Sequence, residues 1–582
     1  MTAQQPTTDI YRATDRNRKN RRVLIIFCLM AIVLGAYQAW DTRNTMNSDG
    51  ISYLDMGDAY VRGDWDMAVN AYWSPLYSWL LGLAILIFNP SPYWEFSVVH
   101  LANFLIYLCA LVCFYFFLKQ LIHYHRHRIS RSPECKYANY PEWALIVFGY
   151  SLFIWTSLDL ITISIVTPDM CVAAFVYLAS GILLRIRRGS ISRLTFLTLG
   201  VVLGFSYLAK AIMFPLSFIF LLISLFLVGN FRKAMPRVLI ALTGFLLVAG
   251  PFISALSDSK GRLTYGDSGK LNYAWYVNSV TQWVHWQGEP PGSGIPWHPT
   301  RKIFNEPAVY EFGTPIGGTY PPWYDPSYWH EGVRIHFNLS EQLPVIKKIL
   351  SKYADILFKL QPSLITGCLI LYYLSRRRWL CVKDIAGQWS LFIPAIAAMG
   401  IYSLVHVENR FIGVFIVLFW AGIFSGVRLP ESDKSKTLLS CIPVFIAMLI
   451  MIGVVYSPLL KAYNQIKSNR ISSAPHVSWQ VAETLNRMGL RAGDKVASIG
   501  WSGSNYWARL ARFRIVADIP KEEKYKFLEA DRSIKSQVYE TFSKTGAKAI
   551  VIYEDEGLQC YDYLDEWKRI GDTPYFVYIL SE

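Results

Sequence analysis

The sequence has 582 residues, of which 53% are hydrophobic and 17% are charged, and its mean hydropathy is +0.26. A soluble protein of this length would divide into several domains with a more charged surface, so this balance argues against one and indicates a chain whose main solvent is lipid. The net charge of +15 does not indicate nucleic-acid binding, because the basic residues lie in short loops between apolar runs and are not gathered on one candidate domain.

Apolar runs long enough to cross the hydrocarbon layer of a membrane, which is about 30 Å thick, recur from Arg22 almost to Tyr463. Basic loops fall between alternate runs, and this positive-inside pattern places the N-terminus in the cytoplasm. We therefore predict a multi-pass protein of the cell inner (plasma) membrane with about eleven spans. The predicted spans are 22–40, 95–118, 142–157, 168–185, 194–210, 212–229, 238–256, 354–374, 386–404, 411–427 and 438–459.

Three long segments, 41–94, 257–353 and 460–582, all fall on the opposite, extracytoplasmic face. The apolar run 77–88 in the first of them is only about a dozen residues long, so we predict an interfacial helix there instead of a span. The second segment is too long for a simple connector and is rich in Trp, Tyr, Gly and Pro. Such a segment is typical of a lid or a binding loop.

The predicted fold class is an all-α polytopic membrane protein with a small C-terminal α/β domain. Residues 1–21 form a cytoplasmic tail, 22–460 the transmembrane domain, and 471–582 the extracytoplasmic α/β domain. Within the last domain we predict a helix at 479–488, a helix and a strand within 505–518, and strands at 495–500, 547–553 and 575–580. We expect this domain to recognise an acceptor or to stabilise the outer face, and not to carry catalysis.

The first outer loop holds three acidic residues. Asp49 follows the first span closely, where its carboxylate could accept a proton from an acceptor hydroxyl while a lipid tail stays in the bilayer. The alternative is that Asp49 caps the helix that begins near Ile51. Asp55 and Asp58 have the spacing of a solvated helix face, and a binding role is the alternative.

Further charged residues map to the outer ends of spans. Asp169, in Thr167-Pro168-Asp169, could bind substrate or could simply complement a helix dipole. Lys210 and Arg410 lie in very short outer loops with no other basic residue, and ionisable residues at such depth indicate function by default. Snorkelling of Lys210 to the interface is the alternative. Together with Glu408, these groups would suit a substrate in which a phosphate is joined to a sugar.

Other cofactor signals are weak. No Gly-rich phosphate loop precedes a helix, and no outer segment has a His or Cys spacing typical of a metal site. A divalent metal held by carboxylates is compatible with the sequence, but the spacing does not demand one.

Taken in order, these motifs resemble those of polytopic glycosyltransferases of the GT-C fold, in the branch that contains protein O-mannosyltransferases and the lipid A aminoarabinose transferase. The resemblance covers roughly residues 20–460. The motifs that carry it are Asp49 after the first span, Ser74-Pro75-Leu76-Tyr77, Thr167-Pro168-Asp169, Lys210 and Glu408-x-Arg410.

The resemblance implies that Asp49 is the catalytic base and that Lys210 and Arg410 bind the donor phosphate. The residues that we assign to substrate binding are Asp169, Lys210, Glu408, Arg410, Tyr53 and Tyr77. The chain departs from the pattern at Gly50, where many relatives have a second acid, and at Ser74, which replaces the first Pro of a Pro-Pro pair.

The predicted function is inverting transfer of a sugar, a hexose or a pentose, from a polyprenyl-phosphate-linked donor to a glycan, lipid or protein acceptor on the extracytoplasmic face. Membrane lipids are the other expected partners, and nucleic acid is not. Two alternatives stay open: a transporter or flippase of a lipid-linked or small polar substrate, and a polymerase or ligase of lipid-linked glycans.

Overall fold

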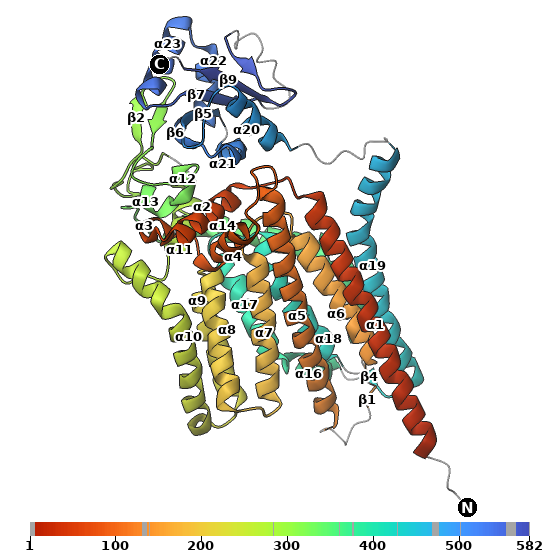
Figure 1. The fold of residues 1–582 in the computed structure, drawn as a ribbon. Coiled ribbons are helices and arrows are strands. Elements are labelled where there is room, and N and C mark those ends of the chain that lie inside the picture. The colour runs from red at the N-terminus through yellow and green to blue at the C-terminus, as the bar shows by residue number, and fades with distance from the viewer. Residues whose placement is uncertain are drawn as a thin grey trace, which may run out of the picture.

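The structure is a computed structural model in which the N-terminal end and the C-terminal domain lie at opposite ends of a helical bundle (Figure 1). The long outer segments gather at the same end as the C-terminal domain. The described residues are 6–130, 137–138, 140–282, 285–359, 361–374, 378–427, 429–467, 476–500, 502–554 and 566–580.

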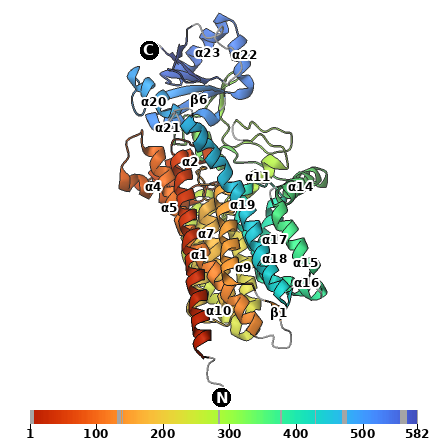
Figure 2. The same ribbon diagram turned by 90° about the vertical axis from the view of Figure 1, so that its right-hand side faces the viewer.

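Each predicted span coincides with a helix. The helix over 339–354 lies outside the predicted spans, in the segment 257–353 that the sequence analysis places on the outer face, and it forms a bent pair with the helix of span 354–374. The bundle helices are α1 (Pro6–Asp41), α5 (Glu95–Ser130), α6 (Glu142–Trp155), α7 (Asp169–Arg187), α8 (Arg193–Ala209), α9 (Met213–Leu227), α10 (Phe231–Lys260), α14 (Leu339–Ala354), α15 (Pro362–Leu374), α16 (Arg378–Ala386), α17 (Trp389–Ser403), α18 (Asn409–Gly426) and α19 (Asp433–Lys467). Two π-helical turns, η1 (Thr156–Leu160) and η2 (Asp355–Lys359), extend α6 and α14. Figure 2 shows α14, α15 and α16 at the edge of the bundle.

The number of spans depends on how the shorter helices are counted. Among the described residues, seven helices are long and apolar enough to cross a membrane, and the bent pair formed by α14 and α15 gives an eighth. The other three predicted spans are helices of 17, 15 and 15 residues, namely α8, α9 and α17. These are shorter than the roughly 20 residues that a full crossing needs, so helix length alone supports eight spans at most.

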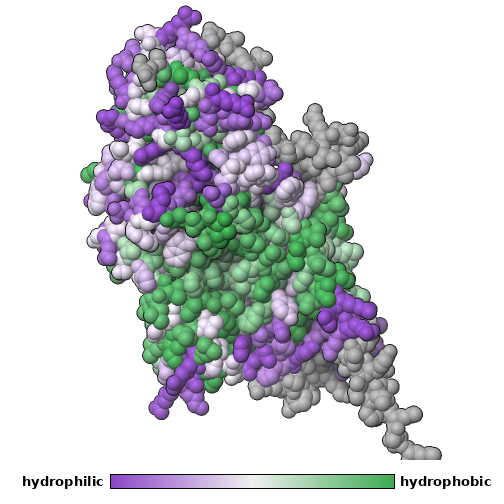
Figure 3. Space-filling view, in the orientation of Figure 1, coloured by the Kyte–Doolittle hydropathy of each residue, from purple (hydrophilic) through white to green (hydrophobic). Residues whose placement is uncertain are grey.

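The surface of the bundle has the pattern expected in a bilayer. On the face shown in Figure 3, hydrophobic residues form a band across the middle of the bundle, and hydrophilic residues gather at both ends. Apolar side chains such as Val33, Val112 and Leu247 are more than 60% exposed along these helices. A large exposed apolar surface of this kind marks a face that contacts lipid.

The first outer segment forms α2 (Ser48–Arg62), α3 (Trp65–Ala68) and α4 (Pro75–Phe88). Helix α4 has 14 residues, which agrees with the short interfacial helix that the sequence predicts. It crosses α2 closely, because a Cβ atom at Gly57 would lie 2.9 Å from the backbone oxygen of Ser78, and one at Gly82 would lie 2.8 Å from that of Gly57. These two glycines therefore fix the position of α2, the helix that carries Asp49.

The second outer segment forms short helices and two strands, and the strands join the C-terminal domain. Within the described residues the sheet has seven strands in the order β2-β3-β6-β5-β7-β9-β8. Strand β5 is parallel to β6 and β7, whereas β3 and β9 are antiparallel to their neighbours β6 and β7. The strands are β2 (Arg301–Phe304), β3 (Val309–Glu311), β5 (Lys495–Gly500), β6 (Arg514–Pro520), β7 (Ala549–Tyr553), β8 (Lys568–Arg569) and β9 (Tyr575–Ile579).

The helices outside the bundle complete this end of the molecule. They are α11 (Ser268–Tyr276), α12 (Pro321–Tyr324), α13 (Pro326–Trp329), α20 (Val477–Arg487), α21 (Tyr506–Ala511), α22 (Lys524–Glu529) and α23 (Arg532–Lys544). The predicted strands at 495–500, 547–553 and 575–580 are observed. The unit is not confined to 471–582, as the sequence analysis expects, because β3 of the second outer segment completes one side of its sheet by pairing with β6.

Candidate active site

The start of helix α2 is tied to the start of helix α7. The backbone N–H of Val166 donates to Oδ1 of Asn47 at 2.8 Å, just before the two helices begin. A Cβ atom at Gly50 would lie 2.8 Å from Cβ of Val166 and 2.6 Å from Sδ of Met46, so a larger residue has no room there. A second acid after Asp49 would therefore be crowded against Val166 and Met46.

The alternative that Asp49 caps helix α2 is wrong. Helix α2 begins at Ser48 with Asn47 in the capping position, and Asp49 lies in the first turn. Its Oδ2 atom lies 3.4 Å from both Nη1 and Nη2 of Arg410, and its Oδ1 atom accepts no hydrogen bond from the described residues. One carboxylate oxygen is therefore available to a ligand.

Asp169 pairs with Lys210 across the start of α7 and the end of α8. The Lys210 Nζ atom lies 2.6 Å from Oδ1 of Asp169 and 3.7 Å from the centre of the Phe411 ring. The side chain of Asp169 is 3% exposed and that of Lys210 is 23% exposed. Among the described residues, Oδ2 of Asp169 is buried and has no hydrogen-bond partner. Lys210 thus has a buried partner and does not need to snorkel away from the protein.

Arg410, in the first turn of α18, joins the carboxylates. Its Nε atom donates to Oε2 of Glu408 at 2.6 Å, and its Nη1 atom lies 3.7 Å from Oδ2 of Asp169. His406 lies 3.4 Å from the other oxygen of Glu408. The contacts of Arg410 with Asp49 and Asp169 are long for charged hydrogen bonds, so the guanidinium keeps N–H groups for an incoming anion.

These side chains line one cavity of about 860 Å³ at the end of the bundle next to the C-terminal domain. Aromatic rings form much of its remaining wall, among them the stacked pair Tyr276 and His406, whose centroids are 4.1 Å apart. The loop before α11 contributes Arg262 and Lys270. A cavity with aromatic faces and a few convergent charges is typical of a site for a sugar or another polar ligand.

Burial and neighbouring charge set the protonation of the groups outside the spans. Burial raises the pKa of the Asp49 carboxyl, although the Arg410 guanidinium partly offsets this effect. Burial also acts to raise the pKa of Glu408, but the hydrogen bond from His406 and the charge of Arg410 outweigh it and lower the pKa to about 2. Asp49 is thus the carboxylate of this pair that can take up a proton more readily.

The described residues offer no group of three or more His, Cys, Asp or Glu side chains arranged to hold a metal ion. In the cavity, the Arg410 guanidinium lies between the carboxylates of Asp49 and Asp169, where a cation would bind. The carboxylate-held divalent metal that the sequence allows stays a prediction.

The structure brings together six of the seven residues that the sequence assigns to the site. Tyr53 is among the residues that line the cavity, and burial raises its pKa well above the ordinary range, so its hydroxyl stays a donor. Tyr77 is the exception. It is fully buried, donates to Oδ1 of Asn103 at 2.5 Å and packs edge-on behind Tyr53, so it supports the wall and does not line it.

Sequence reasoning missed most of the aromatic lining. Trp73 is in the motif that precedes Tyr77, and Phe411 directly follows Arg410, so proximity to a charged motif was the available signal. Tyr276 and His406 come from segments about 130 residues apart, and only the fold brings them together.

The prediction that Asp55 and Asp58 lie on a solvated face is wrong. Arg509 of α21, which is 4% exposed, binds both of them through Nη1, with N–O distances of 2.7 Å and 2.6 Å. Its Nε atom donates to Glu95 at 2.6 Å, and Arg512 lies 2.5 Å from the other oxygen of Glu95. The C-terminal domain is thus clamped onto α2 and α5 by buried charge.

No family model matches the sequence, and no curated protein matches it significantly. Among solved structures, the chain is similar to two of ArnT from Cupriavidus metallidurans. The identity is 12% to the structure bound to undecaprenyl phosphate and 13% to the apo structure. Each match has a TM-score of 0.48 and covers 95% of this chain and 97% of that chain. It is also similar to an oligosaccharyltransferase from Archaeoglobus fulgidus in complex with Zn and sulfate, with 14% identity, a TM-score of 0.49, and coverage of 91% of this chain and 68% of that chain.

Both kinds of protein are glycosyltransferases of the GT-C fold, the class that the sequence motifs resemble. Because the identities are this low and the TM-scores are below 0.5, we transfer no activity, ligand or residue role from these proteins to this chain.

Proposed function

We propose that this protein is a membrane glycosyltransferase that moves a sugar from a polyprenyl-phosphate-linked donor to an acceptor hydroxyl at the extracytoplasmic face of the membrane. The observation that carries the proposal is the cavity in which Asp49, Asp169, Lys210, Glu408 and Arg410 meet at the outer end of the bundle. The acceptor is a glycan, a lipid or a protein.

The position of the cavity suits a lipid-linked donor. Lys210 and Arg410 lie at the outer ends of helices α8 and α18, where the apolar part of the bundle meets the outer segments. A phosphate at this boundary can bind both cations while its polyprenyl chain stays in the hydrocarbon layer. A water-soluble sugar nucleotide would have no need of cations at this depth.

In the proposed reaction, the carboxylate of Asp49 acts on the acceptor, and the cations Lys210 and Arg410 act on the donor phosphate. Asp49 takes the proton of the acceptor hydroxyl, and the acceptor oxygen forms a bond to the anomeric carbon with inversion. The bond between that carbon and the donor phosphate oxygen breaks, and its electron pair stays on the lipid phosphate. Lys210 and Arg410 stabilise the negative charge that develops on this leaving group. Asp169 and Glu408 hold the two cations in place.

Replacement of the base tests the proposal. In vesicles that contain the full-length protein, Asp49→Asn is expected to lower transfer from polyprenyl-phosphate hexoses and pentoses by about 10²- to 10⁴-fold, because a carboxamide cannot accept the proton. Asp66→Asn is the matched control, since Asp66 is an exposed acid in the same outer segment. Transfer would be measured by mass spectrometry of the glycosylated products.

Two outcomes would contradict the proposal. Unchanged transfer by Asp49→Asn would remove the role of Asp49 as base. Movement of the lipid-linked sugar across the vesicle membrane without any new glycosidic bond would favour the flippase alternative instead.

A further inference from the structure

Gln342 of helix α14 joins two walls of the reaction cavity from behind. It is 4% exposed and is not among the described residues that line the cavity. Its Nε2 atom donates to the backbone oxygen of Leu404 at 2.9 Å, and its Oε1 atom accepts from the hydroxyl of Tyr273 at 2.9 Å. A backbone oxygen can only accept, so the amide nitrogen faces Leu404 and the amide oxygen is left for Tyr273. One side chain thus connects α11 to the loop between α17 and α18.

That loop, residues 404–408, carries part of the reaction cluster into the cavity. The ring of His406 stacks on Tyr276 of α11, with the two centroids 4.1 Å apart. The Nε2 atom of His406 lies 3.4 Å from Oε1 of Glu408, and Oε2 of Glu408 accepts from Nε of Arg410 at 2.6 Å. The position of the loop therefore decides where the Arg410 guanidinium is held.

Helix α14 holds this loop at two points. Gln342 binds its first residue, Leu404, and further along the helix Lys352 donates from Nζ to the backbone oxygen of Val407 at 2.5 Å. No residue of α14 is among the described residues that line the cavity. Because both ends of a short loop are fixed, α14 sets the position of the loop from outside the cavity.

A small displacement matters here because of the charges around Arg410. Its guanidinium lies 3.4 Å from Oδ2 of Asp49 and 3.7 Å from Oδ2 of Asp169. A guanidinium released from Glu408 is free to close these gaps, because opposite charges attract strongly in a buried site. Each N–H group that then bonds to a carboxylate is lost to an incoming phosphate.

We infer that Gln342 is a positioning residue, which keeps N–H groups of Arg410 free for a phosphate by fixing the loop 404–408. Gln342 does not touch the phosphate and acts through Glu408. The inference rests on the proposed function for the identity of the ligand, the phosphate end of a polyprenyl lipid.

Gln342→Met tests the inference, since methionine has a similar length and forms neither hydrogen bond. Tyr353→Phe is the matched control, because the Tyr353 hydroxyl donates from the same helix to the backbone oxygen of Met399 in α17 at 2.8 Å. Both variants lose a bond between α14 and the α17 region, but only the first releases the loop. The full-length protein in detergent micelles would be titrated with a long-chain polyprenyl phosphate by calorimetry, and thermal unfolding would compare the stability of the same preparations.

We expect Gln342→Met to raise the Kd about tenfold, the effect of losing one hydrogen bond to a charged group. Lys352→Met releases the other end of the loop and should raise the Kd as well. Tyr353→Phe should leave the Kd unchanged at a similar unfolding temperature. In Gln342→Met the acid limb of kcat/KM should also move to lower pH, because an Arg410 that lies closer to Asp49 favours its ionised form. A residue that only stabilises the fold would move neither quantity.

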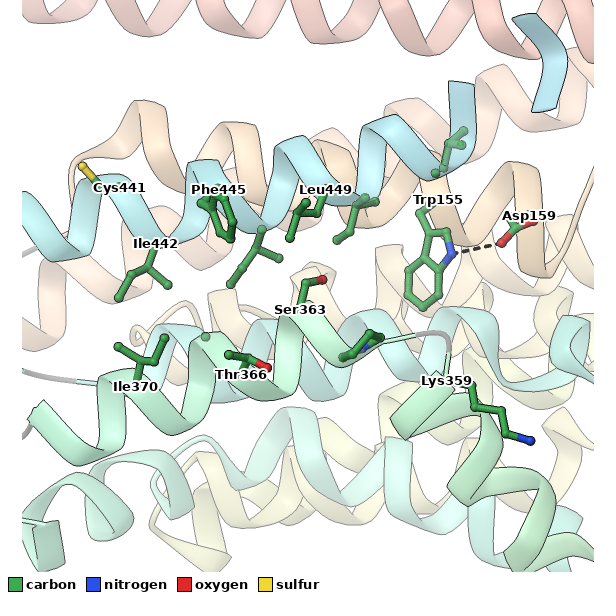
Figure 4. A pocket seen from close by; sticks show the side chains of 16 residues that line it. Trp155, Asp159, Lys359, Ser363, Thr366, Ile370, Cys441, Ile442, Phe445 and Leu449 are labelled. Atoms are coloured by element: carbon green, nitrogen blue, oxygen red, sulfur yellow. Dashed lines mark hydrogen bonds between the residues drawn. The ribbon is translucent and has the colours of Figure 1, made fainter. Parts of the chain in front are cut away.

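A second control comes from the other side of α14, where this helix continues through η2 into α15. A groove of about 880 Å³ lies there between α15 and α19, and Figure 4 shows Thr366 among the residues that line it. Among the described residues, none lines both this groove and the reaction cavity. Thr366→Val should therefore leave the Kd for the polyprenyl phosphate unchanged.

Three results would overturn the inference. The first is an unchanged Kd in both Gln342→Met and Lys352→Met. The second is an equal rise of the Kd in either control, and the third is an acid limb that does not move in Gln342→Met. The Kd is measured without sugar transfer, so a protein that shows the expected Kd values but transfers no sugar would refute the proposed function alone.

Discussion

Two groups of buried charge lie along helix α2, and each combines three carboxylates with two cationic side chains. The first is the reaction cluster, Asp49, Asp169, Glu408, Lys210 and Arg410. Its central contacts are long, since Arg410 lies 3.4 Å from Asp49 and 3.7 Å from Asp169. Every member faces the cavity of about 860 Å³.

The second group is the clamp, Asp55, Asp58, Glu95, Arg509 and Arg512. Its N–O distances are all between 2.5 Å and 2.7 Å, and none of its members lines either of the two large cavities. The same kinds of side chain therefore serve two purposes. Close pairing without open space stabilises a domain contact, whereas loose pairing around a cavity leaves hydrogen-bonding capacity for a substrate.

The largest effect is expected from replacing Arg509, which pairs with all three carboxylates of the clamp. Arg509→Met leaves the buried carboxylates of Asp55 and Glu95 and the half-buried one of Asp58 without their main partner, and should destabilise the protein by about 3–5 kcal/mol. Arg487→Met is the control, because Arg487 pairs with Glu483 on the surface, is 75% exposed, and should cost less than about 0.5 kcal/mol. Thermal unfolding in detergent measures both. Equal unfolding temperatures would show that the clamp has no structural role.

A second change tests how accurately α2 must be placed. Gly50→Ala introduces a methyl group against Val166 and should displace Asp49 from Arg410. A displacement of about 1 Å can cost roughly 10²-fold in rate, so we expect kcat to fall by up to that factor with little change in KM. Gly400→Ala is the control, because a Cβ atom there has nothing within 4 Å. Steady-state kinetics that show no fall in kcat would mean that Asp49 does not act from this position.

A change at Tyr77 tests whether this residue supports the cavity wall or binds the substrate. Tyr77→Phe removes its hydrogen bond to Asn103 and should cost about 0.5–1.5 kcal/mol of stability. Because Tyr77 lies behind the cavity wall, KM for the donor should stay constant. Unfolding and kinetic measurements on the same preparation give both quantities. A higher KM without a change in stability would restore Tyr77 as a substrate ligand.

The smallest expected effect is a shift in pH dependence. Asp49 must be ionised to act as a base, and its pKa is raised, chiefly by burial, so activity should fall as the pH drops through this raised value. The negative charge of Glu408 also raises the pKa of Asp49. Glu408→Gln should therefore move the acid limb of the kcat/KM profile to lower pH, by less than about one unit. The exposed Glu483→Gln is the control, and a shift of Glu408→Gln to higher pH would assign the limb to another group.

The sequence alone determined where the bundle helices lie and five of the charged residues that line the cavity. Apolar runs of sufficient length predict helices in lipid, and the alternation of basic loops predicts a side for each long segment. Charged residues such as Lys210 and Arg410 stand out because lipid makes unpaired charge costly, so local sequence was enough to identify them.

Only the tertiary structure decided how the residues pair. Asp55 has the local pattern of an exposed residue, and it is buried because Arg509, more than 450 positions later, folds back onto α2. In the same way, β3 completes the C-terminal sheet from the second outer segment, and Tyr77 lies behind Tyr53 instead of beside it. Periodicity and composition describe the surroundings of a residue along the chain, whereas these contacts depend on segments that meet only after folding.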